Sequence, residues 1–115
     1  MEDVDVAIVG GGVVGLASAR AIAKHGLSTC ILERHPRVGL ESSTHNSGVI
    51  HAGIYYPHGS LKAKLCVKGR EELYRFCEEH DIPYAKCGKL IVGLRDEDTT
   101  RLEQLARQGC KNGVE

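Results

Sequence analysis

Three glycines early in the chain have the spacing of a dinucleotide-binding turn. Gly10, Gly12 and Gly15 form a G-x-G-x-x-G pattern directly after the apolar run Val4–Val9. Gly10 allows a tight turn from strand to helix, Gly12 lets the backbone approach a pyrophosphate, and Gly15 lets the helix pack on the strand. The pattern therefore indicates a phosphate cradle, and the simpler alternative is a glycine-rich turn that binds nothing.

The helix start and the next apolar run supply the remaining groups of such a site. The first amides of a helix, here those of Val13 and Val14, have no intrahelical partner and face an anion at the positive end of the helix dipole. Glu33 ends the second apolar run, eighteen positions after Gly15, and offers a carboxylate to ribose hydroxyls. Arg34, the next residue, is a candidate for the same site.

These residues require a strand, a helix and a second strand to hold them. The apolar run Val4–Val9 is typical of a strand buried on both faces of a parallel sheet. The pattern predicts a helix over Val13–His25 with a left-handed cap at Gly26, then a parallel strand over Ser28–Glu33. Arg34–Ser43 has no period and is expected to be a loop.

The second half of the chain predicts two helices and one strand. A helix is expected over Ser60–His80, with Ser60 as its N-cap, and a final helix over Asp96–Cys110. Between them, Lys89–Leu94 is expected to be a strand. The fold class is therefore α/β, the N-terminal and incomplete part of a Rossmann-like domain, because a doubly wound sheet needs more parallel strands than these.

Composition excludes several classes of protein. Fifteen Lys and Arg balance fifteen Asp and Glu without a basic cluster, which argues against nucleic acid and against a polybasic membrane anchor. The five cysteines include no C-x-x-C pair, so neither a zinc site nor a disulfide framework is expected, and no metal is predicted. No signal-peptide pattern is visible, and we expect the chain to begin near Met1 in the cytoplasm.

A second segment decides which dinucleotide is expected. The run HNSGVIHAGIYY at residues 45–56, followed by GSLKA at 59–63 and CGKLIV at 87–92, resembles the D-amino-acid-oxidase-like family of FAD enzymes, most closely its L-2-hydroxyglutarate dehydrogenase branch. The resemblance covers nearly the whole chain. Ser42-Ser43-Thr44 departs from the Gln-Thr-Gly usual in that branch.

The resemblance implies FAD as cofactor and oxidation of an L-2-hydroxy acid to a 2-oxo acid, with hydride transfer to the flavin. It also implies a glutathione-reductase-type fold, with residues 1–83 in the FAD-binding domain and 84–115 beginning the substrate domain, the remainder of the enzyme lying beyond residue 115. A membrane quinone as electron acceptor, and hence contact with the periphery of the inner membrane, is implied by the resemblance alone.

Such a reaction needs a base for the hydroxyl proton, and histidine titrates nearest to neutral pH. The candidate catalytic residues are His51 and His45. The resemblance implies that residues 42–56 approach the flavin or its pyrophosphate, and the candidate cofactor-binding residues there are Ser43, Thr44, His45, Asn46 and Ser47. Tyr55 or Tyr56 is expected along the substrate cavity.

Three functions stay open at this point, and the first is the oxidation of an L-2-hydroxy acid. The substrate of the family member can instead be glycerol 3-phosphate or an amino acid, because glycerol-3-phosphate dehydrogenases carry a related I-H-x-G pattern, here Ile50 to Gly53. The third alternative is a nucleotide-binding fragment without catalysis.

Overall fold

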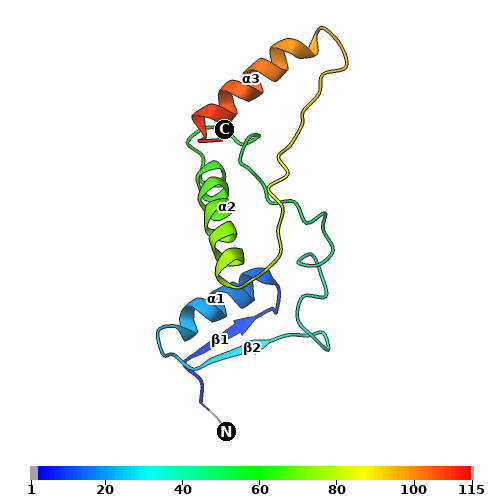
Figure 1. Ribbon diagram of the computed structural model, residues 1–115. Helices are drawn as coiled ribbons and strands as arrows, with labels where there is room; N and C mark the ends of the chain where they lie inside the picture. Colours follow the sequence, from blue (N-terminus) through cyan, green and yellow to red (C-terminus); the bar gives the residue numbers. More distant parts are fainter. Residues whose placement is uncertain (1–2, 115) are drawn as a thin grey trace. The chain divides into compact units, whose positions relative to one another are not determined.

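The computed structural model describes residues 3–114, and these form two compact units that divide after Val49. The elements along the chain are β1 (Val6–Val9), α1 (Val13–Ala23), β2 (Thr29–Leu32), α2 (Leu61–Glu79) and α3 (Asp98–Lys111). The first unit holds β1, α1 and β2, and the second holds α2 and α3 (Figure 1).

The first unit is a parallel β-α-β motif. β1 and β2 pair in parallel, with a register that runs from Val6 opposite Thr29 to Val9 opposite Leu32. α1 packs on both strands (Figure 1). The predicted strand, helix and parallel strand are therefore confirmed, as is the left-handed cap at Gly26, whose φ is +77°.

A reciprocal contact fastens the starts of the two strands. The Asp5 carboxylate accepts hydrogen bonds from the Ser28 amide at 2.8 Å and the Ser28 hydroxyl at 2.7 Å, and the Asp5 amide donates to Ser28 Oγ at 2.9 Å. The hydroxyl and then the amide of Ser28 hold the pKa of Asp5 below its usual value. This contact sets the register before the first pair of the ladder.

β1 is covered on one face only. Its residues alternate between half-buried and exposed, and the Val9 side chain is 86% exposed. The expectation of burial on both faces is wrong for these residues, because α1 covers one face and nothing within residues 3–49 covers the other.

In the second unit, α2 begins where its capping residue predicts. The Ser60 hydroxyl accepts a hydrogen bond from the Ala63 amide at 3.1 Å, which satisfies one of the free donors of the first turn. Among residues 3–114, Ala63 and Cys77 are the only buried apolar side chains, and both lie on α2.

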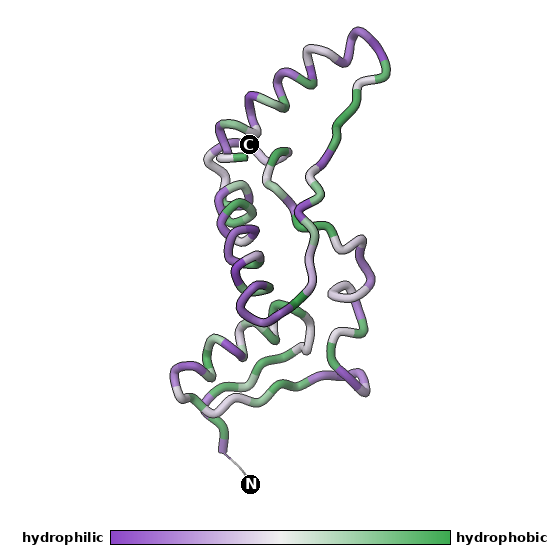
Figure 2. Tube along the Cα trace, viewed as in Figure 1, coloured by the Kyte–Doolittle hydropathy of each residue, from purple (hydrophilic) through white to green (hydrophobic). Residues whose placement is uncertain are grey.

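The predicted strand over Lys89–Leu94 does not form within residues 3–114. These residues belong to no helix or strand, and Leu90, Val92 and Leu94 are 87%, 70% and 91% exposed. Figure 2 shows this part of the trace, which leads up to α3, as largely hydrophobic. A strand requires a hydrogen-bonded neighbour, and within the described part of the chain none is placed beside this segment.

The two compact units do not coincide with the two domains expected from the sequence. The units separate at Val49, whereas the expected domains separate after Pro83. The units reflect contacts within these residues, so the assignment of 1–83 and 84–115 to two domains of a longer protein stays a prediction.

Candidate functional site

The glycines of the first turn are required by close contacts. Gly10 has a φ of +104°, in the region that favours glycine. A Cβ at Gly15 would lie 2.0 Å from the carbonyl oxygen of Gly10, and one at Gly12 would lie 3.1 Å from Ser43 Oγ. Gly15 therefore brings α1 against the turn, and Gly12 brings the turn against the loop that follows β2.

The start of α1 presents amides in an orientation suited to an anion. The Val13 amide donates to Ser43 Oγ at 2.8 Å. Within residues 3–114, the amides of Val14 and Gly15 have no hydrogen-bond partner, and the first turn of α1 contains no acidic residue. This arrangement fits a pyrophosphate, because bare amides and the helix dipole both favour negative charge.

Glu33 lies beside the turn, directly after β2. Its Oε2 accepts from the Gly11 amide at 2.7 Å, and its Oε1 accepts from the His35 amide at 2.9 Å. These two backbone hydrogen bonds, that from His35 first, hold the pKa of Glu33 below its usual value. Each carboxylate oxygen can accept a second hydrogen bond, so the group is oriented and able to receive ribose hydroxyls.

A cleft of about 800 Å³ lies along these residues. Its walls are the ends of the two strands, the turn and the loop: Val9, Gly10, Gly12, Ile31, Leu32, Glu33, Arg34, His35, and residues 39–43. The cleft therefore lies at the carboxyl ends of parallel strands, where ligands of open α/β sheets bind.

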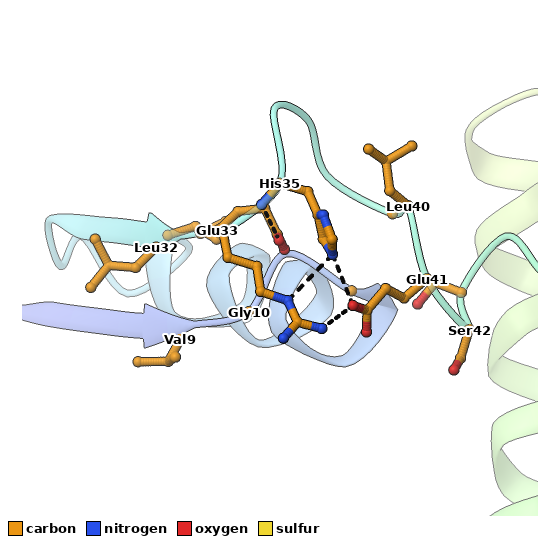
Figure 3. A pocket seen from close by; sticks show the side chains of 13 residues that line it. Val9, Gly10, Leu32, Glu33, His35, Leu40, Glu41 and Ser42 are labelled. Carbon is orange, nitrogen blue, oxygen red and sulfur yellow. Dashed lines mark hydrogen bonds and ion pairs between the residues drawn. The ribbon is translucent and has the colours of Figure 1, made fainter.

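Three charged or titratable side chains meet at the rim of this cleft. His35 Nε2 lies 2.8 Å from Glu41 Oε1, and Arg34 forms an ion pair with the same carboxylate (Figure 3). The hydrogen bonds from His35 and then from Arg34 lower the pKa of Glu41, and Glu41 raises that of Arg34. Arg34 is thus paired within the protein. His35 and Glu41 were not expected here, and no regular spacing in the sequence reveals the cluster.

The other candidates of the second segment hold the loop itself. Thr44 donates to the Gly39 carbonyl, His45 Nδ1 to the Glu41 carbonyl at 3.0 Å, and Asn46 Nδ2 to the carbonyls of Ser42 and Ser43, both at 3.1 Å. The structure brings Ser43 to the helix start and uses its neighbours to shape the loop. Ser47 is exposed.

His51 lies in the second compact unit, beside Tyr56. The two side chains meet at 3.1 Å, between His51 Nδ1 and the Tyr56 hydroxyl. They line a cavity of about 670 Å³ together with Leu61, Lys62, Leu65 and Cys66. Lys62 Nζ lies 4.5 Å from the centre of the Tyr56 ring. The structure thus places an imidazole with a hydroxyl partner at an open cavity.

Two polar residues near the end of α3 also contact this segment and were not singled out from the sequence. Gln108 and Asn112 donate to backbone carbonyls of residues 53–56. The Asn112-Gly113 pair signals only the end of a helix in the sequence, and the contacts span 54 to 59 positions, so no local pattern identifies them.

Comparison with known proteins finds similar sequences among L-2-hydroxyglutarate dehydrogenases. The chain is 56% identical over 115 residues to the mitochondrial L-2-hydroxyglutarate dehydrogenase of Nematostella vectensis, and 53% identical over 112 residues to that of Homo sapiens. These matches cover 98% and 96% of this chain, but only 25% and 24% of the relatives. The chain therefore spans about a quarter of their length.

A solved structure has the same fold. The L-α-glycerophosphate oxidase of Mycoplasma pneumoniae, dithionite-reduced and with FAD bound, superimposes with a TM-score of 0.82 at 33% sequence identity. The match covers all of this chain and 30% of the oxidase. The expected fold class, the N-terminal part of an FAD-binding α/β domain, is confirmed.

The comparisons correct the expected compartment. The L-2-hydroxyglutarate dehydrogenases that match are named as mitochondrial in animals, a slime mould and a plant, so the expectation of a cytoplasmic protein is wrong. That expectation rested on the missing secretory signal-peptide pattern, which does not distinguish a cytoplasmic protein from one that is directed to an organelle by another signal. Among residues 3–114, no helix is long and apolar enough to cross a bilayer.

The family is also identified directly. The family model described as DAO, FAD dependent oxidoreductase, matches residues 5–115, which include the glycine turn, Glu33, and the segment HNSGVIHAGIYY from which the resemblance was inferred. The bare amides at α1 and the oriented Glu33 carboxylate fit the adenosine and pyrophosphate part of that cofactor. The chain belongs to the DAO family of FAD-dependent oxidoreductases.

Proposed function

We propose that the full-length protein oxidises L-2-hydroxyglutarate to 2-oxoglutarate with FAD as cofactor. The observation that carries the proposal is the identity of 48–56% to L-2-hydroxyglutarate dehydrogenases, which extends over 93–98% of this chain. That stretch includes both the cofactor cleft and the cavity with His51.

In this proposal the first unit holds the adenosine end of the cofactor. The amides of Val14 and Gly15 bind the pyrophosphate, together with Val13, which now donates to Ser43. Glu33 accepts from the ribose hydroxyls, since both of its oxygens are already oriented by backbone amides. When bound, FAD supplies the acceptor for the substrate hydride.

His51 is the proposed general base. Oxidation of a secondary alcohol removes one hydride and one proton, and the proton must leave the hydroxyl oxygen as the carbonyl forms. If Nδ1 donates to the Tyr56 hydroxyl, Nε2 carries the lone pair that takes this proton. His45 is the second candidate, and its Nδ1 likewise donates, to the Glu41 carbonyl.

The test uses the full-length protein loaded with FAD and mixed anaerobically with L-2-hydroxyglutarate. We expect the visible flavin absorbance to bleach, and His51→Ala to slow the bleaching about 10²- to 10⁴-fold with FAD retained. His25→Ala, at an exposed histidine after α1, is the matched control and should leave the rate unchanged. A His51→Ala variant with the wild-type rate would remove His51 as the base, and His45→Ala would then be decisive.

A second substrate is favoured by one observation, the 0.82 TM-score to a glycerophosphate oxidase. Bleaching by glycerol 3-phosphate, and not by L-2-hydroxyglutarate, would establish that alternative. We also propose a membrane quinone as electron acceptor, following the family resemblance. Faster reoxidation by a soluble quinone analogue than by oxygen would support this choice.

A further inference from the structure

The segment that carries His51 and Tyr56 has no regular structure of its own. Residues 50–59 lie in neither a helix nor a strand, so their carbonyl groups receive no ladder or helical hydrogen bonds. Backbone carbonyls away from solvent need donors from elsewhere. The conformation of residues 50–59, here called the turn, therefore depends on the groups that donate hydrogen bonds to these carbonyls.

Two side-chain amides donate these hydrogen bonds, one on α3 and one at its C-cap. Gln108 Nε2 donates to the Ile54 carbonyl at 2.9 Å. Asn112 Nδ2 donates to the carbonyls of both Gly53 and Tyr56, each at 2.9 Å. All three hydrogen bonds are partly buried, so water competes for them less than at an open surface.

Both polar atoms of the Asn112 side chain are engaged. The two acceptors of Nδ2 require the NH₂ group to face the turn, and Oδ1 lies 3.1 Å from His58 Nδ1. The Asn112 backbone amide also closes the last turn of α3, by bonding to the carbonyls of Gln108 and Gly109. The end of the helix and the turn are thus joined through one residue.

α2 holds the beginning of the same turn. Cys66 Sγ donates to the His51 carbonyl at 3.3 Å, and Arg70 Nη1 donates to the Ala52 carbonyl at 3.5 Å. Gly53 has a φ of +100°, and a Cβ there would lie 3.0 Å from Val67 Cγ2. The turn therefore contacts α2 at residues 51–53, and Gln108 and Asn112 donate hydrogen bonds to it at residues 53–56.

We propose that Gln108 and Asn112 are positioning residues that set the His51–Tyr56 pair. The inference rests on the proposed function of His51 as a base. Asn112 fixes the Tyr56 carbonyl, which places the Tyr56 ring so that its hydroxyl meets His51 Nδ1 at 3.1 Å. With His51 Nδ1 as the donor in that contact, Nε2 is the basic nitrogen. Within residues 3–114, His51 Nε2 has no hydrogen-bond partner.

The experiment compares two amide-to-carboxylate changes in the full-length protein, one at the C-cap of α3 and one on α3 itself. Asn112→Asp replaces the two N–H donors with an oxygen that repels the carbonyls of Gly53 and Tyr56. Gln104→Glu makes the same change at an exposed position and is the control. We expect Asn112→Asp to lower kcat about 10- to 100-fold with KM little changed, because misplacing a reacting group by an ångström costs about that much.

Two readouts are independent of activity. Hydrogen exchange of residues 51–58, measured without substrate, should rise in Asn112→Asp and not in Gln104→Glu. Nitrogen NMR of labelled histidine should show His51 moving from the single Nδ1–H tautomer toward a mixture. If Asn112→Asp does not fold, Gln108→Met removes one donor at similar volume and should show the same changes to a smaller extent.

The outcomes separate the two proposals. Unchanged exchange and an unchanged His51 tautomer in both the Asn112 and Gln108 variants would overturn the positioning role. A wild-type protein whose flavin no 2-hydroxy acid reduces would overturn the proposed function, while exchange and NMR would still decide how the turn is held.

Discussion

The contact between Gly15 and Gly10 leaves no room for a side chain. A Cβ at Gly15 would lie 2.0 Å from a backbone carbonyl oxygen, which cannot rotate away as a side chain does. We predict that Gly15→Ala destabilises the full-length protein by about 1–3 kcal/mol, the usual cost of forcing extra atoms into a packed site. FAD affinity should fall with it, because α1 must move from the turn. Thermal unfolding with and without FAD measures both effects.

At Gly69 we expect substitution by alanine to have the opposite effect on stability. It lies inside α2, and a Cβ there would meet nothing within 4 Å. Gly69→Ala should therefore stabilise the protein by about 0.5–1 kcal/mol, since alanine loses less conformational freedom in a helix. Equal destabilisation by the two substitutions would show that the Gly15 contact is not the cause.

The Glu33 carboxylate should make the stability of the folded protein depend on pH. The amides of His35 and Gly11 lower its pKa in the folded state, so its contribution to stability is complete above the ordinary carboxylate pKa of about 4.3 and is lost as pH falls through the lower, folded-state value. Glu33→Gln should lower the melting temperature at neutral pH, and the difference from wild type should shrink below about pH 4.

The same substitution should weaken FAD binding about tenfold or more, because a charged acceptor of the ribose hydroxyls is lost. Glu103→Gln, at an exposed carboxylate on α3, is the matched control and should change neither property. A melting-temperature difference that stays constant from pH 7 to pH 3 would contradict the assignment of the effect to the Glu33 carboxylate.

At the residue scale, the sequence predicts groups whose partners are near in the chain or belong to a recurrent motif. The glycine turn and Glu33 are of this kind. The Arg34, His35 and Glu41 cluster and the Asn112 contacts are not, because they depend on how a loop without period is folded and on pairs up to 59 positions apart. The sequence alone therefore does not predict which side chains meet at the rim of the cleft.

At the element scale, helices were predictable because their signals are local. Ser60 caps α2 as expected, and Gly26 ends the turn after α1 with a positive φ. The segment 89–94 shows the limit of such reasoning. Its composition is that of a strand, but strand formation depends on a partner, and the partner is not specified by the segment itself.

We predict that residues 89–94 form a strand in the full-length protein, paired with a segment outside this chain. The exposed side chains of Leu90, Val92 and Leu94 alternate with the half-buried Ile91 and Gly93, as in a strand with one face covered. Amide exchange over 90–94 should be slow in the full-length protein and fast in the isolated chain. Fast exchange in both would disprove the pairing.

At the scale of the whole chain, the described residues have little interior. Ala63 and Cys77 are the only buried apolar side chains among residues 3–114, whereas eighteen large hydrophobic side chains are exposed. A chain of this size normally buries a contiguous core, and large exposed apolar patches mark contact surfaces. These surfaces are where we expect the rest of the enzyme to pack.

It follows that the 115-residue chain alone should retain FAD poorly. Only the adenosine and pyrophosphate groups of the cofactor have candidate partners in the cleft, and the fold around them lacks a core. After dialysis we expect a nearly colourless protein that binds a hydrophobic dye, in contrast to a yellow full-length protein. One flavin per isolated chain after dialysis would refute this expectation.

The hydrogen bonds from Asn112 also impose an order of events during synthesis. The residues that line the cofactor cleft all lie between Val9 and Ser43, whereas the turn at 53–56 requires a residue 59 positions after Gly53. At about 5–20 residues per second, translation leaves that turn without its donors for roughly 3–12 s. The residues of the nucleotide cleft thus emerge first, and the histidine turn is set only when the end of α3 has emerged from the ribosome.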